Sequence, residues 1–273
     1  MSALRAGAIG YLPSTLALLS IPHLGSADAV YERDGGRMKL RVVADPTFGL
    51  PHGRAARILL IWLTTRAVQT QAPVIDLGLS QSAFFRALGI PGSRGANGSI
   101  TRYADQLDKL FHSLFTITNL NQSPATFHNY LLAARGPLFG RASRLHAGSL
   151  LLGDLHLNHD FFLECVTHGV PIDLRAVRAL RSTIALDLYI FLTYRLRILK
   201  RPLRLSWPAL MAQLGISPPL GNAAALRAAT TRLKASLQEV LLVYPRAMVR
   251  YDAQSVELSG SPPPISVKDA SCG

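Results

Sequence analysis

Apolar and polar positions along the chain divide it into two stretches with similar elements. In the first stretch, apolar positions at helical spacing predict a long helix over residues 54–70. Ser80 is placed as the N-cap of a short helix over residues 81–88, which Gly89 closes. The other elements predicted here are strands at 38–44 and 74–77, a third helix at 100–115, and strand-like segments at 116–119, 127–134 and 149–157.

The second stretch repeats this order. Ser206 is placed as the N-cap of a short helix over residues 207–214, and Gly215 closes it. The other predicted elements are a short helix (171–181), a long apolar helix (184–199), a strand (203–205), a third helix (222–242) and a hairpin (248–251 with 256–258). Local sequence matches too, because 61–65 resembles 190–194 and 80–90 resembles 206–216.

Helix, strand, capped helix, turn, longer helix and hairpin, in this order, are typical of a winged helix-turn-helix. Because the order occurs twice, we predict an α+β protein with two tandem winged-helix domains. The expected organisation is a poorly ordered leader (1–37), an N-terminal winged helix (38–140), a C-terminal winged helix (141–260) and a Pro-rich tail (261–273).

The net charge of the chain indicates which class of partner the protein binds. The 273-residue chain has 29 Lys and Arg against 16 Asp and Glu, a net charge of +13. Residues 38–140 hold ten bases and four acids, residues 141–260 hold fifteen and eight, and both ends are neutral. The positive charge therefore belongs to the two predicted domains, which favours a polyanionic partner.

Other function classes lack their signals. The most apolar segment, residues 183–199, contains Asp187, Arg195 and Arg197, so we expect no membrane span and a cytoplasmic protein. The glycine-rich stretch 92–99 is not followed by the Lys-Ser/Thr of a phosphate-binding loop. His156 and His159 have no third ligand, and the two cysteines, at 165 and 272, form neither a disulfide framework nor a zinc finger. We expect no catalysis, no cofactor and no metal.

The third helix of the second stretch has the features of a DNA-reading helix. A helical wheel places Leu226, Ala229, Leu233, Leu237 and Val240 on a buried stripe. Arginine can bind guanine edges, glutamine can bind adenine, and threonine and lysine can bind phosphates. The outward side chains are of these kinds: Arg227, Thr231, Lys234 and Gln238, with Arg232 on the flank. The alternative interpretation is an ordinary solvated basic face.

The third helix of the first stretch is predicted to be a weaker reader. Its outward face includes Thr101, but Asp105 and Asp108 on that face would repel phosphates. Arg94, Arg102 and Lys109 could still bind the DNA backbone. A protein-contact or solvated face is the alternative here. Further DNA-binding candidates are Lys200, Arg201 and Arg204 around the turn after the long helix, and Arg250 in the hairpin.

Several longer motifs resemble one family, the plasmid-encoded RepA replication initiators. They cover residues 59–65, 98–102, 171–180, 185–196, 205–210, 243–245 and 261–264. The resemblance implies binding to repeated double-stranded origin sequences (iterons), help in opening the origin, and recruitment of the host replication initiator and helicase. It also implies a homodimer that represses its own promoter. In this family pattern the first winged helix mediates dimerisation and assists DNA binding, while the second is the main DNA reader. The resemblance also implies a location in the bacterial cytoplasm, at the plasmid or nucleoid.

Two other functions remain open from the sequence. A tandem winged-helix transcriptional repressor would bind promoters and would not maintain a plasmid. An enzyme that nicks DNA would convert supercoiled origin DNA to a nicked product when a divalent metal is added.

Overall fold

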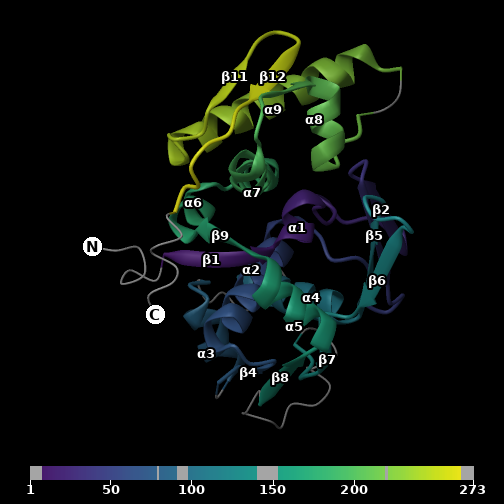
Figure 1. Ribbon diagram of the computed structural model, residues 1–273. Coiled ribbons are helices and arrows are strands. Elements are labelled where there is room, and N and C mark those ends of the chain that lie inside the picture. Colours follow the sequence, from purple (N-terminus) through teal and green to yellow (C-terminus); the bar gives the residue numbers. More distant parts are fainter. Residues whose placement is uncertain (1–7, 79, 91–97, 140–152, 219–220, 266–273) are drawn as a thin grey trace. The chain divides into compact units, whose positions relative to one another are not determined.

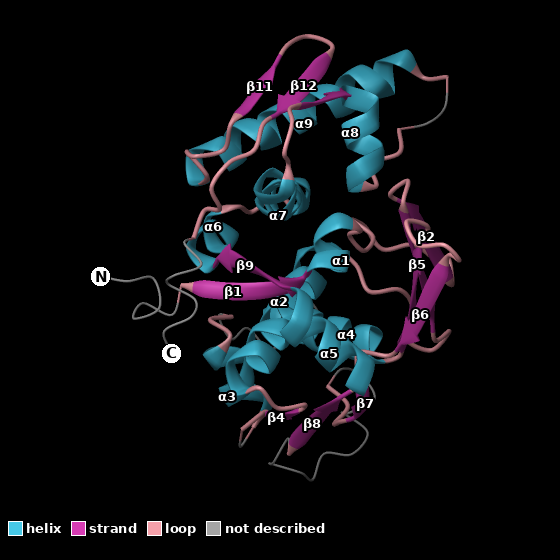
Figure 2. Ribbon diagram, in the orientation of Figure 1, coloured by secondary structure: helices cyan, strands magenta, loops and turns pink. Residues whose placement is uncertain are grey.

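A computed structural model describes residues 8–78, 80–90, 98–139, 153–218 and 221–265 (Figure 1). The chain forms two compact units. The central unit comprises residues 21–32 and 37–169, and the C-terminal unit comprises residues 1–20, 33–36 and 170–273, each within the described ranges. Figure 2 shows that each unit combines helices with small sheets.

The C-terminal unit contains a winged helix that follows the predicted order. Its elements are α7 (Thr183–Ile198), β10 (Leu203–Ser206), α8 (Trp207–Leu214), α9 (Ala223–Val243), β11 (Val249–Tyr251) and β12 (Ser255–Leu258). The predicted caps are present, since the Ser206 hydroxyl accepts from the Ala209 amide at 3.3 Å and Gly215 has φ 68°. The antiparallel sheet has the order β10-β12-β11, so β12 lies between the other two strands.

The central unit contains the second copy of this arrangement. Its elements are α2 (Gly53–Thr70), β4 (Val74–Asp76), α3 (Gln81–Ala87), α4 (Ser99–Phe111), β7 (Ala133–Arg135) and β8 (Asp154–Leu157). The sheet order β4-β8-β7 corresponds to β10-β12-β11. Helix α5 (His159–His168) then packs on α2. The prediction of an α+β protein with two winged helices is confirmed.

A four-stranded sheet is added to the central winged helix, and two of its strands, β5 (Ser113–Asn119) and β6 (Thr126–Tyr130), are inserted in the chain between α4 and β7. Its order is β2 (Val30–Asp34), β3 (Met38–Ala44), β5 and β6. The helix predicted to reach residue 115 therefore ends at Phe111, and the chain continues as β5. β5 pairs with β3 from Ser113 opposite Ala44 to Asn119 opposite Met38.

Two expected boundaries differ from the structure. The boundary placed after residue 140 falls between β7 and β8, which are paired strands of one sheet. Residues 8–37, expected to be a poorly ordered leader, contain β1 (Ile9–Pro13), α1 (Ser14–Leu18) and β2. Their apolar side chains explain the difference, because Leu12, Leu16 and Leu19 are buried.

The described part of that N-terminal segment belongs mainly to the C-terminal unit. β1 pairs with β9 (Gly169–Asp173), and α1 packs on α7. The strand β9 lies where the sequence predicted the start of a helix, and the helix α6 (Leu174–Ala179) follows it. The expected Pro-rich tail also packs on this unit as far as it is described: Ile265 is buried, and the Tyr244 hydroxyl donates to the Pro262 carbonyl at 2.7 Å.

Candidate nucleic-acid interface

Helix α9 has one buried side and one exposed side. Ala229, Leu233, Leu237 and Val240 are buried, as the helical wheel predicts. Leu226 differs from the prediction, because 37% of it is exposed near the start of the helix. Only five of the 21 residues of α9 are buried, so most of its length is available to a ligand.

Two arginines define the exposed side. Arg227 and Arg232 are exposed, and their guanidinium groups have no polar partner among the residues that the structure describes. Ala224, Ala228 and Ala235 are exposed as well. Small side chains of this kind allow a helix to approach the floor of a groove, while the two guanidinium groups stay available for bidentate contacts.

Three other predicted readers on α9 contact the protein itself. The Thr231 hydroxyl donates to the Arg227 carbonyl at 3.0 Å. The Gln238 side-chain amide donates to the Tyr251 hydroxyl at 3.2 Å. Lys234 is half-buried and donates to the Ala253 carbonyl at 3.5 Å. The partners of Gln238 and Lys234 lie on the wing, so a helical wheel cannot reveal these two contacts.

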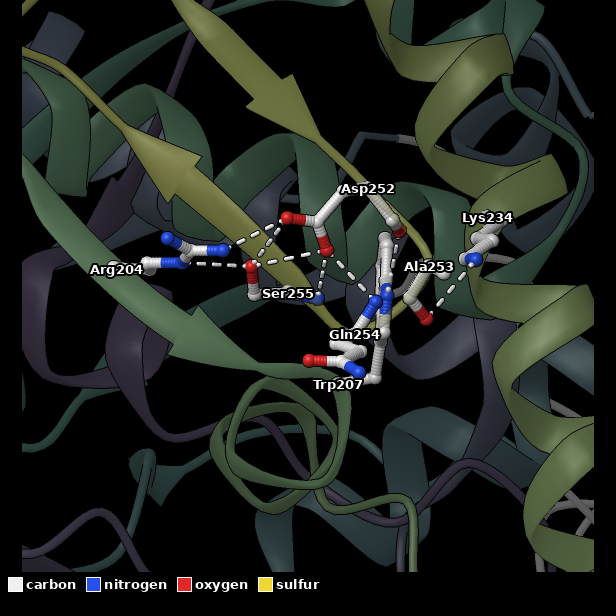
Figure 3. Close-up of polar contacts among 7 residues, drawn as sticks. All are labelled: Arg204, Trp207, Lys234, Asp252, Ala253, Gln254 and Ser255. Carbon is white, nitrogen blue, oxygen red and sulfur yellow. Dashed lines mark hydrogen bonds and ion pairs between the residues drawn. The ribbon is translucent and has the colours of Figure 1, made fainter.

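Arg204, predicted to contact DNA, has polar partners within the protein. Its guanidinium donates to Asp252 Oδ2 at 2.8 Å and to the Ser255 hydroxyl at 2.9 Å (Figure 3). Backbone amides of Gln254 and Ser255 also donate to the Asp252 carboxylate, and these bonds hold the pKa of Asp252 below its ordinary value. Arg204 is therefore ion-paired with Asp252, while 66% of its side chain stays exposed.

The other cations predicted to bind DNA in the C-terminal unit are exposed to solvent. Arg250 is exposed and stands opposite Glu257 in the strand register, on the face away from the buried Val256 and Leu258. Lys200 and Arg201 are exposed after the end of α7, and their charged groups have no polar partner within the described ranges. They stay candidates for phosphate contacts.

Helix α4 of the central unit is far more covered than α9. Seven of its 13 residues are buried. Asp108, predicted to face outward, is 2% exposed and accepts from the Phe139 amide at 2.8 Å. The Gln106 side chain accepts from the His52 amide at 2.8 Å. Neighbouring residues therefore cover more of α4 than the sequence predicted.

Of the four residues predicted to contact DNA from the central unit, three lie within the described residues. Arg102 is exposed, and Thr101 and Lys109 are half-buried. Partial burial lowers the pKa of Lys109, and the nearby Asp105 opposes that shift. Arg94 lies outside the described residues. The structure thus leaves Arg102 as the most accessible of the three for the DNA backbone.

No metal site is found among the described residues, where no group of three or more His, Cys, Asp or Glu could hold an ion. The His156 ring nitrogen Nε2 lies 2.8 Å from the Arg135 guanidinium, and since arginine can only donate, it accepts there. Within the same ranges, no helix is long and apolar enough to cross a membrane.

Cys165 is a buried thiol whose Sγ lies 3.7 Å from the Thr64 hydroxyl. Burial raises the pKa of Cys165 to about 12, so at pH 8 the group stays a neutral thiol. We therefore expect Cys165 in a Cys272→Ser variant to resist a disulfide reagent at pH 8 in the native state and to react fully in 6 M guanidinium. The absorbance of the thiolate that the reagent releases measures the rate of labelling. Fast labelling of the native variant would contradict the burial of Cys165.

The fold defines a tandem winged-helix protein, and its helix α9 has an exposed basic face. The family model of the plasmid-encoded RepA protein matches residues 50–208. The chain therefore belongs to the RepA family of plasmid replication initiators, as its motifs indicate.

One solved structure supports the fold. The crystal structure of a selenomethionine derivative of domains 2 and 3 of RctB has a TM-score of 0.52 at 13% identity, covering 91% of this chain and 96% of that one. A second crystal structure of RctB domains 2–3 has a TM-score of 0.47 at 14% identity, covering 94% and 95%. A sequence comparison with curated proteins gives no significant match.

Proposed function

We propose that this protein starts plasmid replication by binding repeated sequences (iterons) at the plasmid origin, with α9 of the C-terminal unit as the main reader. The observation that supports this most is the exposed side of α9. It presents the two arginines Arg227 and Arg232 beside small alanines, and Glu239 is its one exposed acid. Such a face fits a major groove, whose guanine edges accept bidentate hydrogen bonds from arginine.

The central unit has an accessory role in this proposal. Arg102 on α4 is exposed and can contact phosphates, but the covered remainder of α4 does not fit a groove-reading role. Phosphate contacts hold the protein on the duplex without reading its sequence. The proposal extends to helping open the origin, to recruiting the host replication initiator and helicase, and to repressing the protein's own promoter in the bacterial cytoplasm. Family membership supports these functions.

A homodimer formed through the inserted sheet is part of the proposal. β6 pairs with β5 alone among the described strands, so it is an edge of that sheet. Phe127, the second residue of β6, is 67% exposed, and the following His128 and Asn129 are exposed as well. An unpaired edge with an exposed aromatic side chain is suited to pairing with a second strand.

Phe127→Asp is therefore expected to weaken dimerisation by roughly tenfold or more, because a charge at a sheet edge opposes strand pairing. Sedimentation equilibrium measures the dissociation constant. Leu163→Asp is the matched control, because it places the same charge at a 44%-exposed leucine on α5 of the same unit. Equal dimerisation of both variants and the wild type would rule out this edge as the interface.

Plasmid maintenance tests the function itself. The protein is supplied from a separate gene to a plasmid that carries the origin but lacks the initiator gene. An initiator maintains the plasmid. A transcriptional repressor binds a promoter and gives no maintenance. If purified protein converts supercoiled origin DNA to a nicked form with divalent metal, it is instead an enzyme.

A further inference from the structure

The tip of the wing is organised around one carboxylate. Asp252 follows β11, and its Oδ1 accepts from the Gln254 and Ser255 amides at 2.7 Å each. Its amide donates to the Ser255 carbonyl at 2.9 Å, which closes the turn. Figure 3 shows these bonds converging on Asp252, together with the ion pair to Arg204.

Further bonds connect this turn to α8. The indole Nε1 of Trp207 donates to the Asp252 carbonyl at 3.2 Å, and the Trp207 amide donates to the Gln254 carbonyl at 3.3 Å. Trp207 is 2% exposed, so it is a fixed part of the core. The wing tip is therefore held against the start of α8.

The same turn places a cation of α9. The Lys234 ammonium lies 5.1 Å from the centroid of the Trp207 ring, where the π electrons attract it. It also donates to the carbonyl of Ala253 at the wing tip, as Figure 3 shows. An ammonium has three donors, so Lys234 can keep these contacts and still bind a phosphate.

We propose that Asp252 is a positioning residue for DNA binding: its carboxylate fixes the wing tip, which in turn holds the Lys234 ammonium at the boundary between α9 and the wing. This inference rests on the proposed function. It assigns Arg204 a supporting role, because its guanidinium neutralises a carboxylate that would otherwise repel DNA. It also makes Lys234 a phosphate contact whose place depends on the wing.

The direction in which DNA affinity changes when an acidic residue is removed distinguishes this proposal from a purely electrostatic effect. Removing an acid from a DNA-binding protein lowers repulsion and strengthens binding. Glu257→Ala on β12 removes the same charge from the same sheet and is the matched control. We expect Glu257→Ala to bind origin DNA as tightly as the wild type or more tightly, and Asp252→Ala to bind about fivefold more weakly.

A conservative variant tests the mechanism. Asp252→Asn keeps an oxygen that can accept from the Gln254 and Ser255 amides, so the turn is retained while the charge is lost. We expect its binding to stay within about twofold of the wild type. Circular dichroism and thermal melting check that all three variants are folded.

The decisive experiment combines Asp252→Ala with Lys234→Ala and measures dissociation constants at several salt concentrations. In the wild-type background, Lys234→Ala should lower the salt slope by about one ion. In the Asp252→Ala background it should have little further effect. Additive effects, or an Asp252→Ala variant that binds like Glu257→Ala, would overturn the proposal. If the wild type itself does not prefer origin DNA over random DNA, the proposed function fails instead.

Discussion

Arg227→Ala is expected to weaken the binding of origin DNA by roughly tenfold or more, a loss of about 1–3 kcal/mol that is typical of one bidentate base contact. Arg227 is exposed near the start of α9, and its guanidinium has no polar partner among the described residues. The variant should lose preference at one position of the repeat, while its binding to random DNA changes little. Fluorescence anisotropy with a labelled repeat and its single-base variants measures both quantities.

Arg178→Ala is the matched control for this prediction. It removes the same exposed charge from α6 of the same unit, away from the reading helix in the sequence. Its effect should be small and should not depend on the DNA sequence. The double variant Arg227→Ala with Lys234→Ala should lose specific binding without unfolding. Equal behaviour of Arg227→Ala and Arg178→Ala would remove the reading role from Arg227.

Leu16→Ala is expected to destabilise the C-terminal unit by about 2–5 kcal/mol. Leu16 is buried in α1, which packs on α7, so its truncation leaves a cavity beside the first helix of the winged helix. Urea unfolding followed by circular dichroism measures the free energy. Leu24→Ala changes a leucine that is 81% exposed and should have almost no effect. Equal stability of the two variants would mean that residues 8–20 do not support this unit.

Helix α9 and its exposed face could be predicted from the sequence, because the sequence pattern that defines them is local. Asn222 caps α9 by accepting from the Ala225 amide, and Leu233, Leu237 and Val240 recur at helical spacing. Periodicity depends on residues a few positions apart, and a helical wheel captures it. The same reasoning identified the exposed Arg227 and Arg232.

The features that sequence reasoning missed depend on contacts between distant residues. Arg204 meets Asp252 48 residues later, and Asp108 meets the Phe139 amide 31 residues later. The wheel had no means to find these partners, so it placed Asp108 in solvent. The wing of the central unit was likewise not recognised from the sequence. β5 and β6 are inserted between α4 and this wing, and the two wing strands, β7 and β8, are themselves separated in sequence.

The central claim is that α9 reads a repeated DNA sequence at a plasmid origin. Footprinting of the purified protein on the DNA that flanks its gene tests this most directly. The account predicts a ladder of evenly spaced protected repeats, each lost in the Arg227→Ala with Lys234→Ala variant. A single protected palindrome, or a ladder that persists unchanged in that variant, would contradict it.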